Sequence, residues 1–153
     1  MDNPRQVIED LIHAVARALD DDRLEAFPTF FTEDGTYKVA SRFNVERGLP
    51  LAQINCTSRG MIADRILSLR KANVYPAQRY RHLISGILVG EGPPIFTVRS
   101  NYLVVRIIDE GASLYSSGEY RDRVRLEGGR ALLEERIVVF DGRSIDSLLA
   151  IPL

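Results

Sequence analysis

The sequence predicts an α+β protein, with helices near the N-terminus and a strongly curved, mainly antiparallel sheet after them. Before residue 72, apolar residues in several segments recur at three- and four-residue spacing, which is typical of amphipathic helices. After residue 78, apolar and polar residues alternate instead, which is typical of strands. Because the helices precede the long strands, we expect them to pack on one face of a single sheet.

Three helices are predicted in the N-terminal part. The first begins at Asn3 and Pro4, an N-cap followed by a proline at the first helical position, and it runs to about residue 19. A shorter helix follows from about Arg23 to Phe31, and Pro28 is expected to shorten or kink it. The third begins after Thr57 or Ser58 and runs to about residue 71, where Asn73 and Pro76 are expected to stop it.

Between the second and third helices the pattern is less regular. Asp34 and Gly35 predict a turn, and Thr36 to Ala40 predicts a short strand. An irregular stretch is expected to continue from there through Gly48 and Pro50.

Four long strands are predicted in the second half. Glycines at positions 86 and 118 are expected to bend two of them, and Glu127 to Arg130 is expected to join the last two as a hairpin. The four segments are Tyr80 to Val89, Thr97 to Ile108, Ser113 to Leu126 and Leu132 to Phe140.

The composition limits the function. The 153 residues are 45% hydrophobic, which fits one globular domain spanning residues 1–153. Twenty basic residues against 21 acidic ones give a net charge of −1, which argues against a nonspecific nucleic-acid binder. The N-terminus resembles no signal peptide, and no apolar stretch is long enough to span a membrane, so we expect a cytoplasmic protein.

The metal ligands are too few for a self-contained metal centre. A Rieske cluster takes two cysteines and two histidines, and a structural zinc site takes four such ligands. The chain offers only Cys56, His13 and His82. We therefore expect no metal-binding and no cofactor-binding residue in this chain, and a single cysteine cannot form an internal disulfide.

Several side chains could handle protons in a small isomerase or dehydratase. His82 lies at the beginning of a predicted strand, and a neutral imidazole there could act as a general base. The other candidate side chains for proton transfer are Asp34, Tyr37, Asp64 and Tyr80, but no spacing marks them as a set. Turn formation explains Asp34, and a solvated or paired helix position explains Asp64.

Charged side chains line the third long strand. Glu119, Arg121, Arg123 and Arg125 share one face, and the next strand is expected to place Glu134 and Arg136 on one face and Glu135 on the other. Such a pattern suits either a wet protein–protein interface or an ordinary solvated face with cross-strand ion pairs. The apolar segment Ser147 to Leu153 must also be buried, on its own core or on a neighbour.

Taken together, these residues resemble the small (beta) subunit of Rieske-type aromatic-ring-hydroxylating dioxygenases. Two segments point to the subfamilies for terephthalate, anthranilate or salicylate: Arg47–Pro50 and Leu69–Tyr75. The family resemblance itself is carried by Phe27–Asp34, Asp64–Ile66, Leu69–Arg70, Arg79–His82, Ser117–Tyr120, Glu135–Val138 and Leu148–Leu153.

The resemblance implies a cystatin-like or nuclear-transport-factor-2-like cone. It also implies a noncatalytic subunit of a multicomponent oxidoreductase, assembled as three large and three small subunits, with self-association as a trimer. The Rieske [2Fe-2S] cluster and the mononuclear iron would lie on the large subunit, and the substrate would be an aromatic compound, with a carboxylated one favoured.

On this interpretation no catalytic residue is expected in the chain, and the functional residues are those of the subunit interfaces. The interface candidates are Arg79, Arg81, His82, Glu119, Arg121, Arg123 and Leu153. Because the same cone also supports enzymes, a stand-alone isomerase or dehydratase is the alternative, and a binding module without chemistry is a third.

Overall fold

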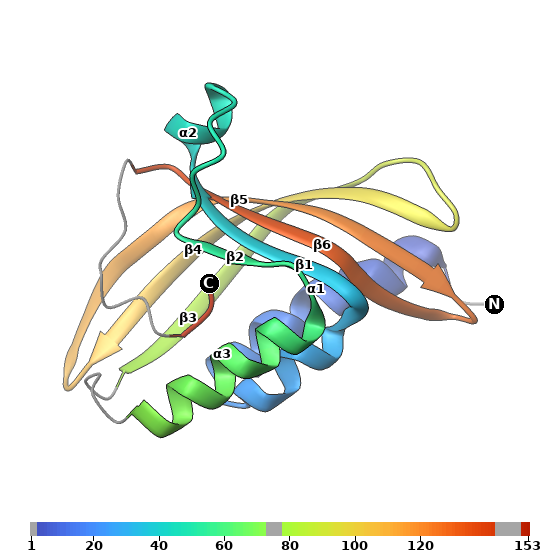
Figure 1. The fold of residues 1–153 in the computed structure, drawn as a ribbon. Helices are drawn as coiled ribbons and strands as arrows, with labels where there is room; N and C mark the ends of the chain where they lie inside the picture. The colour runs from blue at the N-terminus through green and yellow to red at the C-terminus, as the bar shows by residue number, and fades with distance from the viewer. Residues whose placement is uncertain (1–2, 73–77, 143–150) are drawn as a thin grey trace.

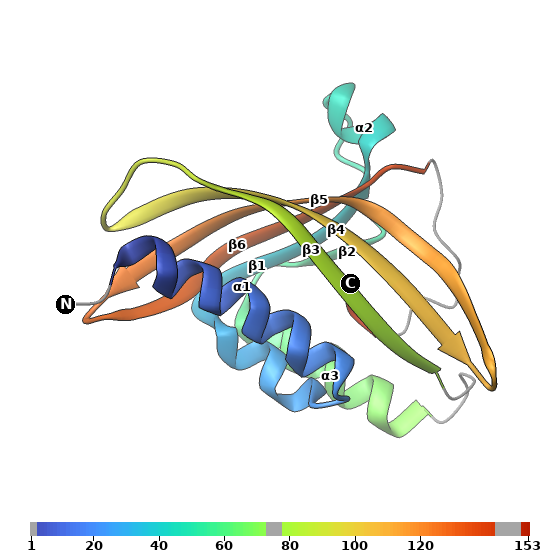
Figure 2. The ribbon, with the colours of Figure 1, turned by 180° about the vertical axis from the view of Figure 1, so that it is seen from behind.

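A six-stranded sheet arches over the two long helices and a 3₁₀ helix, which lie on its inner side, while a short helix projects from the opposite side (Figures 1 and 2). The computed structural model describes residues 3–72, 78–142 and 151–153. The strand order is β2-β1-β6-β5-β4-β3, and only the β1–β6 pair is parallel. The predicted α+β fold, with N-terminal helices on a curved and mainly antiparallel sheet, is confirmed.

The first helix, α1, spans Pro4–Asp20 and begins as predicted. The side chain of Asn3 accepts a hydrogen bond from the main-chain N–H of Arg5 at 3.0 Å, which satisfies one of the free N–H groups of the first turn. Its apolar stripe is buried against the sheet, as the spacing predicts. The next helix, η1 (Leu24–Phe30), is a 3₁₀ helix with Pro28 inside it, in agreement with the expected short helix.

The segment between η1 and the third helix is more ordered than predicted. Strand β1 spans Phe31–Ser41, a short helix α2 spans Arg42–Glu46, and strand β2 spans Ile54–Cys56. The predicted turn at Asp34 and Gly35 is wrong, because both residues lie inside β1. They fall where the pairing of β1 with β6 shifts register, so a local irregularity of a strand produced the turn signal.

Helix α3 spans Arg59–Ala72, close to its predicted bounds. The hydroxyl of Ser58 accepts the main-chain N–H of Met61 at 3.2 Å, which is the capping contact expected at this helix start. Asn73 and Pro76, which we expected to stop the helix, lie outside the described residues. Among the residues that the structure describes, no helix is both long and apolar enough to cross a membrane.

The four long strands are confirmed, each beginning two residues earlier than predicted. The bounds are β3 Gln78–Val89, β4 Ile95–Ile108, β5 Gly111–Glu127 and β6 Arg130–Phe140. The predicted hairpin between β5 and β6 is present, with Glu127 paired to Arg130. Gly86 bends β3 as expected, because it has a φ of +60° and lies where the pairing with β4 shifts register.

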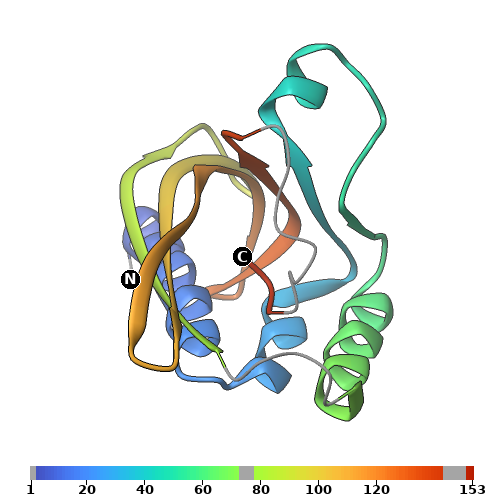
Figure 3. The same cartoon turned by 90° about the vertical axis from the view of Figure 1, so that its left-hand side faces the viewer.

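The inside of the curled sheet is filled by side chains rather than left open. Tyrosines from several strands meet there, and the rings of Tyr102 and Tyr120 stack with centroids 4.8 Å apart. The chain returns to this interior at its C-terminal end, where Ile151 and Leu153 are buried (Figure 3). The described part of the apolar tail therefore docks on its own core, while Ser147 to Ala150 lie outside the described residues.

Candidate functional site

The seven predicted interface residues occupy three places. Arg79, Arg81 and His82 lie at the beginning of β3; Arg79 and Arg81 are exposed, whereas the side chain of His82 is fully covered by the chain itself. Tyr120 and Val124 of β5 lie in the core, so alternation places Glu119, Arg121 and Arg123 on the opposite face of the strand, called here the outer face. Leu153 is buried inside the curled sheet. The structure thus groups six of the seven on two strands and separates Leu153 from them.

The outer face carries a row of cross-strand ion pairs, the charged ladder, formed by Arg99, Glu119, Arg121, Arg123, Arg125 and Glu134. Glu119 is its most buried member and accepts hydrogen bonds from Arg99 and Arg121, each at 2.7 Å. Burial alone would raise the pKa of Glu119, but these two guanidinium groups outweigh burial and hold its pKa below the ordinary value. Glu119 therefore stays ionised and fixes two arginines that face opposite each other on β4 and β5.

The predicted placement of Glu134 and Arg136 on one face is wrong. Val124 pairs with Leu133 and Arg123 pairs with Glu135, so Glu134 is an extra residue on β6, a β-bulge. The alternation is shifted by one residue after the bulge. Glu134 consequently bonds Arg125 on the outer face, whereas Arg136 points into the core.

Arg136 forms a fully buried ion pair with Asp122 that the sequence analysis missed. Its guanidinium donates two parallel hydrogen bonds to the carboxylate, both at 2.9 Å, and lies 3.8 Å from the centre of the Tyr120 ring. Burial raises the pKa of Asp122 above its ordinary value, while Arg136 opposes this rise. The bidentate geometry is that of an ionised pair. Alternation along β5 puts Asp122 on the same strand face as Tyr120 and Val124, and an acid on this otherwise apolar face is the signal that could have pointed to a buried partner.

His82 is held by Asp20 at the end of α1. The imidazole Nδ1 lies 2.6 Å from the Asp20 carboxylate, and the main-chain N–H of His82 donates to both carboxylate oxygens at 3.0 and 3.1 Å. From the sequence, His13 and His82 lie on distant elements, but in the structure both line one small cavity between α1 and β3. Among the described residues, no group of three or more His, Cys, Asp or Glu side chains could hold a metal ion.

The side chains considered for proton handling do not assemble into one site. Asp34 and Asp64 are exposed, whereas Tyr37 and Tyr80 are buried, and burial raises the pKa of both phenols. Burial also raises the pKa of the Cys56 thiol, which disfavours the nucleophilic thiolate.

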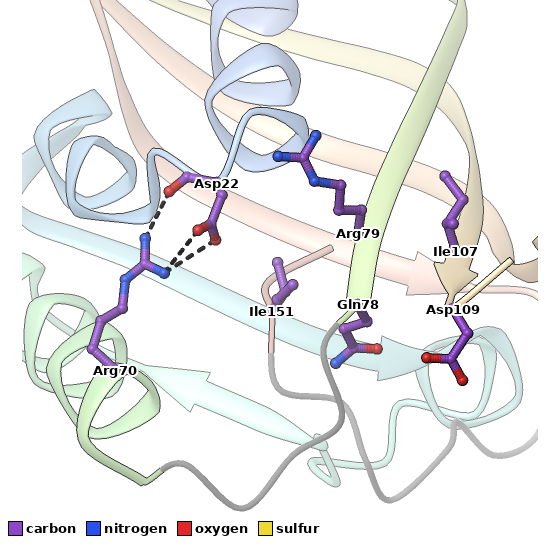
Figure 4. A pocket seen from close by; sticks show the side chains of 7 residues that line it. All are labelled: Asp22, Arg70, Gln78, Arg79, Ile107, Asp109 and Ile151. Carbon is purple, nitrogen blue, oxygen red and sulfur yellow. Dashed lines mark hydrogen bonds and ion pairs between the residues drawn. The ribbon is translucent and has the colours of Figure 1, made fainter.

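A cavity of about 470 Å³ opens at the end of the sheet where β3 begins (Figure 4). Arg70 enters it from α3, but its guanidinium is already bound by the Asp22 carboxylate, at 3.0 and 3.1 Å, and by Glu25 at 2.7 Å. Arg70 in turn lowers the pKa of Glu25. Ile151 closes one wall. Two of the charged groups in the lining, Asp22 and Arg70, are therefore already paired with each other, whereas the other two, Arg79 and Asp109, are exposed.

Comparison with known proteins assigns the chain to a family. The family model described as the ring hydroxylating beta subunit matches residues 14–147. The chain belongs to this family. The sequence resemblance is thus confirmed, and the relatives favour a dioxygenase beta subunit over a stand-alone isomerase or dehydratase.

Two curated relatives and one solved structure illustrate how far the similarity extends. The anthranilate 1,2-dioxygenase small subunit of Burkholderia cepacia is 38% identical, covering 88% of this chain and 85% of that protein. The beta 1 subunit of the terminal oxygenase component of terephthalate 1,2-dioxygenase from a Comamonas species is 37% identical, covering 92% of each chain. The beta subunit of a predicted aromatic-ring-hydroxylating dioxygenase from Novosphingobium aromaticivorans is 39% identical, with a TM-score of 0.89 over 97% of this chain and 95% of that one.

Proposed function

We propose that this beta subunit is the structural partner of a Rieske-type large subunit, in an enzyme that oxidises an aromatic carboxylate. The observation that carries the proposal is similarity over nearly the whole chain to the small subunits of anthranilate and terephthalate dioxygenases, at 38% and 37% identity. Anthranilate and terephthalate are both aromatic carboxylates, which supports that substrate class for the assembled enzyme.

The proposal places the Rieske cluster and the mononuclear iron on the large subunit. Two histidines and one cysteine are too few for a Rieske cluster, which takes two of each. His13 and His82 share a cavity with Asp20, but Asp20 is engaged by both the main chain and the imidazole of His82. The ligands in this chain therefore do not fit either iron site, and no step of the oxidation is assigned to its residues.

We further propose that three of these subunits join three large subunits in a cytoplasmic hexamer, and that the whole chain acts as one domain. The surface residues available for such contacts include the exposed Arg79, Arg81 and Arg123 and the half-buried Arg121. Glu119 supports the interface indirectly, because it holds Arg99 and Arg121 in place.

Co-expression with a Rieske-type large subunit from the same genome tests the proposal. We expect the two chains to purify together and to elute as a complex far heavier than 17.2 kDa, with its mass measured by light scattering. Two folded chains that remain separate at micromolar concentration would contradict it. The matched control is the same large subunit expressed alone.

A further inference from the structure

The small cavity between α1 and β3 has no role in the fold described so far. His13, Arg17 and Asp20 line it from α1, and Arg81 and His82 line it from β3. Its volume is about 210 Å³. This is below the roughly 300 Å³ at which ordinary small-molecule pockets begin, and it suits a single side chain.

His82 lies in the wall of this cavity, and its imidazole has an incomplete hydrogen-bond pattern. Its side chain is wholly covered, and an ionised carboxylate only accepts hydrogen bonds, so the contact with Asp20 places a proton on Nδ1. The other ring nitrogen, Nε2, is buried and has no hydrogen-bond partner in the described part of the chain. Buried polar atoms without a partner are rare in folded proteins because each one costs free energy.

Two arginines at the cavity have no acid to neutralise them. Arg17 and Arg81 are both exposed, and neither forms an ion pair with any residue that the structure describes. The one carboxylate in the lining, Asp20, is already engaged by His82. The cavity therefore presents two free guanidinium groups and His13 around a buried imidazole, which favours an acidic occupant.

The position of the cavity favours a protein as the source of that acid. Strand β3 is the last strand of the sheet, so its outer edge has no strand partner among the described residues, although the Asp20 carboxylate already accepts the main-chain N–H of His82. A segment of another protein can lie along such an edge. Arg79 and Arg81 also project from this strand as exposed cations, which extends the basic surface beyond the cavity.

We propose that one aspartate or glutamate side chain of the large subunit enters this cavity. Its carboxylate is bound by Arg17 and Arg81 at the mouth of the cavity, next to the covered imidazole of His82. This assignment rests on the proposed function, since it names the partner, and it adds residues of α1 to an interface that the sequence placed on β3 and β5 alone.

A double charge reversal, Arg17→Glu with Arg81→Glu, tests the assignment. The matched control is Lys71→Glu with Arg130→Glu, which changes the net charge equally at exposed positions outside the cavity. We expect the first variant to weaken the Kd for the large subunit by about tenfold or more, and the control to leave it within about twofold. Circular dichroism and thermal melting establish that both variants are folded. Reversal of one acidic residue of the large subunit to lysine is expected to restore binding to the Arg17→Glu, Arg81→Glu variant.

The outcomes separate this assignment from the proposed function. Equal binding of wild type and both variants overturns the cavity assignment and leaves the proposed function in place. If the variant binds the large subunit normally but loses self-association in sedimentation velocity, the acid comes from a second copy of this chain and the assignment is wrong. If the wild type does not bind the large subunit at all, the proposed function fails and the assignment fails with it.

Discussion

At the scale of single residues, carboxylate–guanidinium pairs have different roles in the core and at the surface. Asp122 and Arg136 satisfy each other inside the core, where removing one partner would leave an uncompensated buried charge. Glu119 lies at the edge of solvent and organises two arginines that remain reachable from outside. The buried pair therefore specifies how β5 and β6 pack, while the charged ladder remains available to a partner.

Glu119 predicts a pH dependence of stability. Its pKa is lower in the folded chain than the value of about 4.3 in an unfolded one, so its stabilising contribution is present above that pH and is lost as the pH falls through the folded pKa. We expect Glu119→Gln to lower the free energy of unfolding by about 1 kcal/mol at pH 7 and to have little effect near pH 2. Urea denaturation at both pH values measures this.

The control for this prediction is Glu127→Gln. The Glu127 side chain is 69% exposed and, among the described residues, forms its ion pair with Arg125, so its replacement is expected to change stability very little at either pH. If Glu119→Gln lowers the free energy of unfolding as much at pH 2 as at pH 7, then packing, and not charge, accounts for the lost stability.

At the scale of elements, bulges and close strand approaches determine which side chains face out. The bulge at Glu134 turns Arg136 into the core, and the irregularity at Gly86 bends β3. Gly118 plays a different part from Gly86, because β5 approaches β6 so closely there that a Cβ atom would lie 2.0 Å from the carbonyl oxygen of Val139. The expected bend at Gly118 is therefore better described as a contact that only glycine allows.

Gly118→Ala is expected to destabilise the sheet. Because the clash is with main chain and not with a mobile side chain, β5 and β6 must separate, and we expect a loss of about 2 to 3 kcal/mol in the free energy of unfolding. Gly60→Ala is the matched control, since a Cβ there meets nothing closer than 3.8 Å and lies in α3. The Gly60→Ala substitution is expected to raise the free energy of unfolding by about 0.5 to 1 kcal/mol. Equal effects of the two substitutions in urea denaturation would contradict the close approach.

At the scale of the whole molecule, the C-terminal residues close the interior of the cone. The hydroxyl of Tyr37 donates to a main-chain oxygen of Leu153 at 3.1 Å and accepts its main-chain N–H at 3.0 Å. One phenol thus bonds both the main-chain N–H and a main-chain oxygen of a buried residue. This contact joins β1 to a segment 116 residues later in the chain, so it forms only when the sheet has curled.

Tyr37→Phe is expected to loosen this closure. Both polar groups of Leu153 would lose their partner inside an apolar interior, and we expect stability to fall by about 1 to 3 kcal/mol. Hydrogen exchange should show reduced protection of the Leu153 amide. In the control, Tyr102→Phe, only the contact with Ser116 is lost, so the protection of Leu153 should not change. Unchanged protection in Tyr37→Phe would mean that apolar burial alone holds these residues.

The sequence by itself determined the class of the fold and the order of its long elements. Local signals sufficed for these, namely the cap at Asn3, the helical stripe of α1 and the alternation along β3 to β6. It also carried the family resemblance, and its ligand count argued against a Rieske cluster held by this chain alone. It did not reveal α2 or β2, because neither is long enough to show a period.

Only the tertiary structure decided which charged residues meet. Periodicity assumes unbroken alternation, and one extra residue at Glu134 reverses the faces that follow it. The pairs Asp122–Arg136 and Asp20–His82 join residues 14 and 62 positions apart, and the cavity gathers side chains from α1 and β3. Such contacts depend on how the sheet curls and where a helix ends against it, and neither is encoded in a local pattern.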